Sequence, residues 1–205
     1  MTEKPVLWSF RRCPYAMRAR HAVICAGVPV ALREIQLKRK PQMFLETSPS
    51  GTVPCLEDAG TVIDESLEIM VWALEQYDPA KLLQMPEAGW ALIEENDGPF
   101  KRALDHSKYF TRYPDLDRDA ERAKAAAFLH GLDQRLDDQN WLFGRTPRLA
   151  DFAILPFVRQ FANSDRAWFD AQPWPNVIRW LEVYLASAEF EQVMQKHEEW
   201  RAPGP

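Results

Sequence analysis

The spacing of apolar residues changes near residue 80, and this change constrains the fold more than any other feature of the chain. Before it, short strand-like runs alternate with helical runs, whereas every periodic segment after it has helical spacing. The first part predicts strands at residues 6–10, 30–37, 53–57 and 61–64, and helices at residues 14–26 and 66–77. This βαβ-then-ββα order predicts an α+β domain in which helices pack against a small mixed sheet.

A proline-bounded segment, residues 78–86, is predicted to link this domain to a second one. Beyond the linker, the periodicity predicts helices at residues 87–113, 117–138 and 175–188, and another that begins near residue 149. We therefore expect two domains: an α+β domain at residues 1–79 and an all-helical domain at residues 87–205.

The composition argues against several classes of protein. The 205-residue chain has a net charge of −5, which offers no electrostatic footprint for nucleic acid. Its three cysteines, an odd number, make no disulfide framework and suit a reducing compartment. The polar start is unlike a signal peptide, no apolar stretch is long enough to span a membrane, and the four histidines lack metal-ligand spacing. We expect a cytoplasmic protein that binds no nucleic acid, membrane or metal.

Cys13 and Pro14 follow the first predicted strand, at the point where a helix is predicted to begin. Proline suits the first helical position, which places Cys13 at the N-cap. The free N–H groups and the helix dipole at that end favour the thiolate, which is the nucleophilic form of cysteine. Ala16 occupies the place of the second cysteine in a Cys-x-x-Cys motif, so the chemistry is that of a single thiol. The alternative is a buried, inert cysteine, which is our expectation for Cys25 and Cys55.

Two further features of the first domain bear on a binding site. Val53-Pro54 places a proline within an apparent strand, which a cis bond would explain, although most bonds before proline are trans. Asp64-Glu65-Ser66 lies at a strand-to-helix junction, where Ser66 is a good N-cap. The same carboxylate and hydroxyl would also suit a ligand that carries both an ammonium and a carboxylate group, such as an amino acid or its γ-linked peptide.

Together, these motifs resemble the glutathione-binding domain of cytosolic glutathione transferases. The segments Cys-Pro-Tyr-Ala-Met-Arg from Cys13 and Leu-Lys-Arg-Lys-Pro from Leu37 are most similar to the cysteine-type classes, above all omega. Asn-Trp-Leu-Phe-Gly from Asn140, followed by Leu-Ala-Asp from Leu149, resembles the start of the core helix of the family's helical domain. The resemblance implies a thioredoxin-like N-terminal domain, an all-α helical-bundle C-terminal domain, and glutathione as co-substrate.

The resemblance also implies roles for individual residues. Cys13 matches the cysteine that forms a mixed disulfide with glutathione, and Tyr15 matches the aromatic position beside it. Val53, before an expected cis proline, matches the residue whose backbone pairs with the cysteinyl part of glutathione. The remaining matches are Glu65 and Ser66, which would hold the γ-glutamyl group, and Lys40, which would lie near the glycyl end.

One position departs from the family pattern. The core helix is usually capped by Ser or Thr three residues before its aspartate, whereas this chain has Arg148 three residues before Asp151. Asp151 can still serve the first helical turn, but a reciprocal capping box is not expected unless Thr146 substitutes.

These expectations point to thiol transfer, with two alternatives. A Cys13 thiolate would take glutathione from a small mixed disulfide, or act on another electrophile such as dehydroascorbate, and a second glutathione would resolve the enzyme. Tyr15 and Ser9 keep open a glutathione-conjugating transferase, and a non-catalytic interaction module with the same fold is the second alternative. The family also implies a homodimer, for which Ile69 and Trp72, outside the core stripe of their helix, are candidate contacts.

Overall fold

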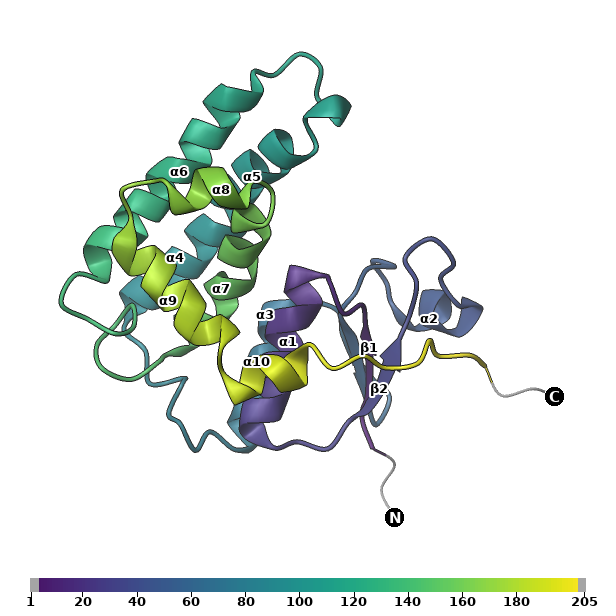
Figure 1. Ribbon diagram of the computed structural model, residues 1–205. Helices are drawn as coiled ribbons and strands as arrows, with labels where there is room; N and C mark the ends of the chain where they lie inside the picture. The colour runs from purple at the N-terminus through teal and green to yellow at the C-terminus, as the bar shows by residue number, and fades with distance from the viewer. Residues whose placement is uncertain (1–3, 203–205) are drawn as a thin grey trace. The chain divides into compact units, whose positions relative to one another are not determined.

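A computed structural model describes residues 4–202, which divide into two compact units. Residues 4–80 and 187–202 form the first unit, and residues 81–186 form the second. The units differ from the expected domains, 1–79 and 87–205, at the C-terminal end, because the last segment packs with the first unit. Figure 1 shows its helix, α10 (Ala188–Val193), beside α1 (Pro14–Ala26).

The first unit contains a four-stranded mixed sheet with strand order β2-β1-β3-β4. Strand β1 pairs in parallel with β2 and antiparallel with β3, which pairs antiparallel with β4. The other elements of this unit, besides α1 and α10, are β1 (Val6–Ser9), β2 (Ala31–Glu34), α2 (Gln42–Thr47), β3 (Cys55–Asp58), β4 (Thr61–Ile63) and α3 (Ser66–Gln76). The predicted βαβ-then-ββα order and the thioredoxin-like fold are thus confirmed.

Alternating side chains of β1 build the core of this unit. Leu7 and Trp8 are adjacent and therefore point to opposite faces of the sheet, and both are fully buried. Trp8 packs in a cluster with Phe44 of α2, Val53 and Cys55, and Cys13 lies against the same cluster. Helices α1 and α3 pack against each other (Figure 1). The turn that carries Cys13 therefore lies against the core of this unit.

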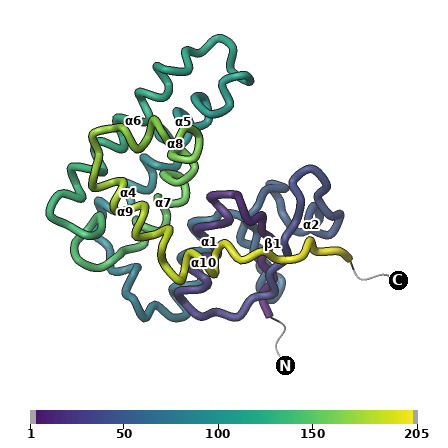
Figure 2. Tube along the Cα trace, viewed as in Figure 1, coloured from purple at the N-terminus to yellow at the C-terminus, as the bar shows by residue number. Residues whose placement is uncertain are grey.

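The C-terminal segment extends the sheet at the edge of β2. The Trp200 N–H donates a 2.7 Å hydrogen bond to the Glu34 carbonyl, and Figure 2 shows the segment continuing from α10 as an extended stretch. The Trp200 ring lies 4.9 Å from that of Trp8, and the Arg33 guanidinium lies 4.8 Å from both rings. Ring packing and a cation–π contact thus hold the segment in place.

The second unit is entirely helical in its regular elements. These are α4 (Glu87–Glu95), the π-helical turn η1 (Asn96–Phe100), α5 (Lys101–Lys108), the 3₁₀ turn η2 (Phe110–Arg112), α6 (Arg118–Arg135), α7 (Leu149–Ala162), α8 (Arg166–Asp170) and α9 (Pro175–Leu185). The single helix predicted over residues 87–113 is wrong, because the chain widens into η1 around Pro99, which lacks an N–H for the helical ladder. None of the helices in the described part of the chain is long and apolar enough to cross a bilayer.

Asp151 caps the core helix α7 despite the departure at Arg148. Its Oδ2 accepts the Arg148 N–H at 2.8 Å, and its Oδ1 accepts the Leu142 N–H at 2.9 Å and Trp180 Nε1 at 3.0 Å. The Arg148 carbonyl accepts the Asp151 N–H at 3.0 Å, in place of the missing hydroxyl. Burial raises the pKa of Asp151 to about 6, although these donors act in the opposite direction.

Candidate functional site

One pocket of about 480 Å³ in the first unit is lined by all six predicted site residues. They come from the start of α1, the loop after β2, the segment before β3, and the β4–α3 junction. The fold therefore brings together positions that are far apart in the sequence. The residues are Cys13, Tyr15, Lys40, Val53, Glu65 and Ser66, together with Leu37, Thr52, Pro54 and Asp64.

Cys13 is the N-cap of α1, as predicted, and Pro14 is the first residue of the helix. Its N–H donates to the Phe10 carbonyl at 3.0 Å, and its carbonyl accepts the Met17 N–H at 2.8 Å. The side chain is half-buried, and its thiol donates to the Val53 carbonyl, with Sγ and O 3.7 Å apart. The dipole at the start of α1 acts in favour of the thiolate, whereas the hydrogen bond to the Val53 carbonyl is made by the protonated thiol.

The other two cysteines lie in different environments. Burial, reinforced by nearby carboxylates, raises the pKa of Cys25 to about 12. Burial and the Asp64 carboxylate likewise raise the pKa of Cys55 to about 12. Both therefore stay protonated near neutral pH, and Cys13 differs from them in its place at the start of a helix.

The Val53-Pro54 peptide bond is cis, as the family resemblance implied. Val53 lies just before β3, so the predicted strand over residues 53–57 begins two residues later, at Cys55. The Val53 carbonyl oxygen accepts the hydrogen bond of the Cys13 thiol, so the backbone before the cis bond lies beside the sulfur.

Glu65 and Ser66 begin helix α3, but with a correction to the predicted cap. The N-cap position is Glu65, without a side-chain capping bond, and Ser66 is the first helical residue. Ser66 is buried, and its Oγ accepts a 3.0 Å hydrogen bond from Arg18 Nε. Because a hydroxyl also donates one hydrogen bond, Ser66 can still donate to a ligand.

The hydrogen bonds that Asp64 makes at the edge of this pocket were not predicted from the sequence. Asp64 accepts hydrogen bonds from Ser48 Oγ at 2.8 Å and from the Ser50 N–H at 2.7 Å. Burial acts to raise the pKa of Asp64, but the hydrogen bonds from Ser50 and Ser48 hold it below its usual value. The carboxylate thereby fixes the loop that leads to Thr52 and Val53. The only sequence signal was the place of Asp64 beside Glu65.

Two cations complete the surroundings of the pocket. Lys40 Nζ donates to the Gly51 carbonyl at 2.8 Å, so it is attached to the same loop that Asp64 fixes. The buried Arg18 guanidinium lies 5.2 Å from the Tyr15 ring and bonds Ser66, as described above. Arg18 is thus a structural link between α1 and α3.

Comparisons with known proteins agree with this arrangement. The family model of the glutathione S-transferase N-terminal domain matches residues 7–81, and that of the C-terminal domain matches residues 115–182. Rat glutathione S-transferase omega-1 is 29% identical over 208 residues, covering 93% of this chain and 79% of the rat protein. The mouse omega-1 match is 25% identical over 169 residues and covers 75% of this chain and 65% of the mouse protein.

Two other matches show how broad the family is. Maleylacetoacetate isomerase of Pseudomonas aeruginosa is 26% identical over 204 residues, covering 91% of this chain and 93% of that protein. A glutathione transferase family member from Pseudomonas fluorescens, solved with two glutathione molecules bound, superposes with a TM-score of 0.81 at 17% identity, covering 94% of this chain and 92% of that one. The chain belongs to the glutathione transferase superfamily.

Proposed function

We propose that this protein is a glutathione-dependent thiol transferase that acts through Cys13. Its co-substrate is glutathione, the ligand named in the structure of the Pseudomonas fluorescens relative. The backbone of Val53 pairs with the cysteinyl part, and Glu65 and Ser66 hold the γ-glutamyl ammonium and carboxylate. Lys40 lies near the glycyl carboxylate, and Tyr15 shapes the wall beside the sulfur.

The observation that carries this proposal is the 3.7 Å contact between Cys13 Sγ and the Val53 carbonyl oxygen. A peptide that pairs its cysteinyl backbone with Val53 brings its own sulfur next to Cys13. Sulfur-to-sulfur attack needs this proximity, because exchange proceeds through a mixed disulfide. The buried Ala16, in place of a second cysteine, leaves glutathione itself as the resolving thiol.

The exchange balances in two steps. The Cys13 thiolate attacks the glutathione sulfur of a mixed disulfide, forms a bond to it, and releases the partner as a thiolate. A glutathione thiolate then attacks the glutathione sulfur on Cys13, which frees the Cys13 thiolate and forms oxidised glutathione. None of the three cysteines is in a disulfide bond in the described part of the chain.

The conjugating alternative needs a hydroxyl group that activates glutathione, and the structure distinguishes between its two candidates, Ser9 and Tyr15. Ser9 is fully buried, and its Oγ accepts a hydrogen bond from Arg20 Nη1 at 2.5 Å, which weighs against a role in activating glutathione. The half-buried Tyr15 lines the pocket and is the remaining hydroxyl candidate. A non-catalytic module would not need a cysteine at this helix start.

The test is to compare wild type with Cys13→Ala, Cys13→Ser and the matched control Cys25→Ala. We expect Cys13→Ala to lose reduction of a glutathione mixed disulfide and Cys25→Ala to retain it. Retained reduction by Cys13→Ala would refute the mechanism, and a gain of conjugating activity by Cys13→Ser would favour the hydroxyl chemistry. A wild-type protein that fails to bind immobilised glutathione would favour the non-catalytic module.

We also propose that the protein is a homodimer, as the family implies. Of the two residues that suggested contacts, Ile69 is fully buried within the chain and is not available to a partner, whereas Trp72 is half-buried. Sedimentation at micromolar concentration is expected to give twice the mass of one chain. A single species of one chain's mass would exclude the dimer without affecting the role of Cys13.

A further inference from the structure

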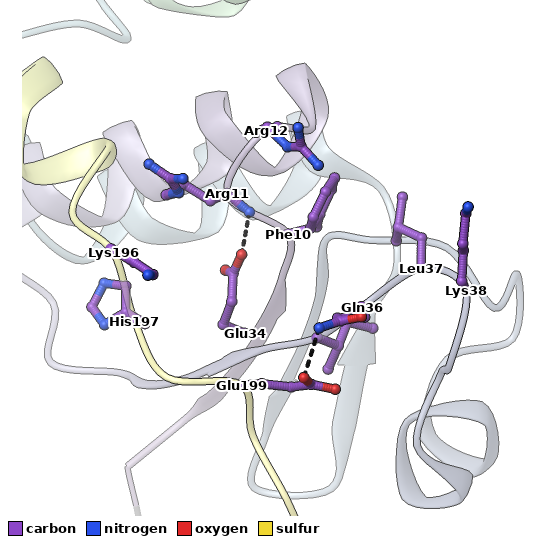
Figure 3. Close-up of a pocket in the computed structure, with 11 residues that line it drawn as sticks. Phe10, Arg11, Arg12, Glu34, Gln36, Leu37, Lys38, Lys196, His197 and Glu199 are labelled. Atoms are coloured by element: carbon purple, nitrogen blue, oxygen red, sulfur yellow. Dashed lines mark hydrogen bonds between the residues drawn. The ribbon is translucent and has the colours of Figure 1, made fainter.

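A second pocket of the first unit, of about 590 Å³, is rich in positive charge. It lies between the turn that follows β1, the segment that follows β2 and the C-terminal segment. Figure 3 shows Arg11 and Arg12 on the first of these, Lys38 on the second, and Lys196 and His197 on the third. Three separate parts of the chain therefore contribute cations to one concave surface.

The two carboxylates of this pocket already have partners. Glu34 Oε1 accepts the Arg11 N–H at 2.6 Å, and its Oε2 lies 3.9 Å from Nη1 of Arg20 (Figure 3 shows the first bond). Glu199 Oε2 accepts Gln36 Nε2 at 2.7 Å and lies 3.5 Å from Nη2 of Arg39. Arg20 and Arg39 are outside the set of residues that line the pocket, so they balance the two carboxylates from outside.

The lining cations are consequently in excess. Within residues 4–202, no carboxylate lies within ion-pair distance of Arg12, Lys38 or Lys196, and these three side chains are exposed. This local positive charge contrasts with the net charge of −5 on the whole chain. A concave surface lined by one sign of charge concentrates ligands of the opposite sign.

The pocket adjoins the site of Cys13. Leu37 lines both pockets, and the turn closed by the Cys13 N–H and the Phe10 carbonyl carries Phe10, Arg11 and Arg12 into the second one. Phe10, Leu37 and the buried Ile35 give it an apolar surface among the charges. An organic molecule with an apolar body and one or more carboxylates suits this combination.

We propose that this pocket binds the second substrate and selects partners that carry carboxylates. The proposal rests on the proposed thiol transfer, and it concerns the half of the mixed disulfide that is not held by the glutathione site. When the Cys13 thiolate bonds to the glutathione sulfur, the partner leaves as a thiolate, and its carboxylate remains paired with the cations. The C-terminal segment therefore takes part in substrate selection through Lys196.

The experiment uses the variant Lys38→Gln/Lys196→Gln, and Lys4→Gln/Arg145→Gln as a matched control. The control positions are also exposed and line neither pocket. The first measurement is the rate at which iodoacetate and neutral iodoacetamide alkylate Cys13, each forming a carbon–sulfur bond and releasing iodide. The second is kcat/KM for glutathione mixed disulfides with 3-mercaptopropionate and with neutral 2-mercaptoethanol.

We expect the pocket variant to react more slowly with the anionic reagents and to react with the neutral ones as the wild type does. The ratio of iodoacetate to iodoacetamide rates falls by roughly threefold or more in the pocket variant, as expected for two exposed charges, and stays unchanged in the control. The kcat/KM ratio of anionic to neutral disulfide falls in the same way, and high salt reduces both differences. An unchanged ratio in either measurement would overturn the proposal. Thiol transfer would be refuted if the wild type exchanged neither disulfide. In that case, a fall of the iodoacetate-to-iodoacetamide ratio in the pocket variant would still support the anion pocket.

Discussion

The Nε atom of Arg18 donates a hydrogen bond to Ser66 Oγ over 3.0 Å, and both side chains are almost fully buried. This bond joins α1, which begins after Cys13, to α3, which begins with Ser66. The residue proposed to hold the γ-glutamyl carboxylate is therefore also part of the packing between two helices. Its replacement should affect stability as well as binding.

Ser66→Ala and Glu65→Ala should accordingly behave differently. We expect both to weaken glutathione binding by about 1–3 kcal/mol, the usual cost of losing a hydrogen bond to a charged group. Only Ser66→Ala should also lower the free energy of unfolding, by about 1–3 kcal/mol, because it removes an acceptor from the buried Arg18 guanidinium. The exposed Glu65 has no such role.

Calorimetric titration with glutathione and denaturant unfolding measure the two quantities separately. Conservative Ser66→Thr, which keeps a hydroxyl, serves as the matched variant. Equal stability of wild type and Ser66→Ala would show that the Arg18 contact contributes little, and unchanged affinity in both alanine variants would remove Glu65 and Ser66 from the proposed binding site.

Native protein should be alkylated at one cysteine only. Burial raises the pKa of Cys25 and of Cys55 to about 12, so neither forms an appreciable amount of thiolate at pH 7.5. We expect mass spectrometry after brief treatment with iodoacetamide to find one adduct, on Cys13, and three adducts after unfolding. Modification of Cys25 or Cys55 at a rate similar to that of Cys13 would contradict the raised pKa of these two thiols.

His21 should make the first unit sensitive to acid. It is fully buried on α1, and burial lowers its pKa from 6.5 to about 3. The unfolded chain therefore binds a proton between these values while the folded chain does not, so stability is lost as the pH falls below 6.5. The loss amounts to about 2 kcal/mol by pH 5.

Replacing His21 with a residue that cannot ionise should remove its contribution to the pH dependence of stability. Unfolding of His21→Gln, measured from pH 7 to pH 5, is expected to lose less stability over that range than wild type, whatever its absolute value. The variant His197→Gln, at an exposed position, serves as the control for replacing a histidine. Parallel curves for wild type and His21→Gln would mean that His21 does not remain neutral in the folded protein.

Asp151 should have the opposite effect in the second unit. Burial raises its pKa from 3.8 to about 6, so the folded chain binds a proton that the unfolded chain has already lost. Stability therefore falls as the pH rises from about 4 to 6, by about 3 kcal/mol in total. In the wild type, this trend offsets that of His21 over part of the same range.

Asp151→Asn isolates the contribution of Asp151. Its amide oxygen can still accept from Leu142 and Trp180, but its NH₂ group would face the Arg148 N–H, so the variant should be less stable at pH 7 by about 1–3 kcal/mol. Denaturant unfolding should show stability that rises with pH more steeply than in wild type, because the opposing contribution of Asp151 is removed. A slope equal to that of wild type would contradict the ionisation of Asp151.

The sequence by itself determined the features that depend on neighbouring residues. Hydrophobic spacing separated the α+β part from the helical part near residue 80, because strands and helices repeat over different periods. Cys13 before Pro14 was identified as the start of a helix, because the chemistry of a cap is local. The order of strands and helices in the first unit followed from the same local signals.

Only the tertiary structure decided what depends on contacts between distant residues. Ser66 meets Arg18, 48 positions away, and the Val53 carbonyl meets Cys13, 40 positions away. The C-terminal segment joins the first unit because Trp200 packs on Trp8, which no local periodicity could indicate. Side-chain packing and hydrogen bonds across the fold, rather than the conformational preference of any segment, assembled the pocket of Cys13 and the cationic pocket beside it.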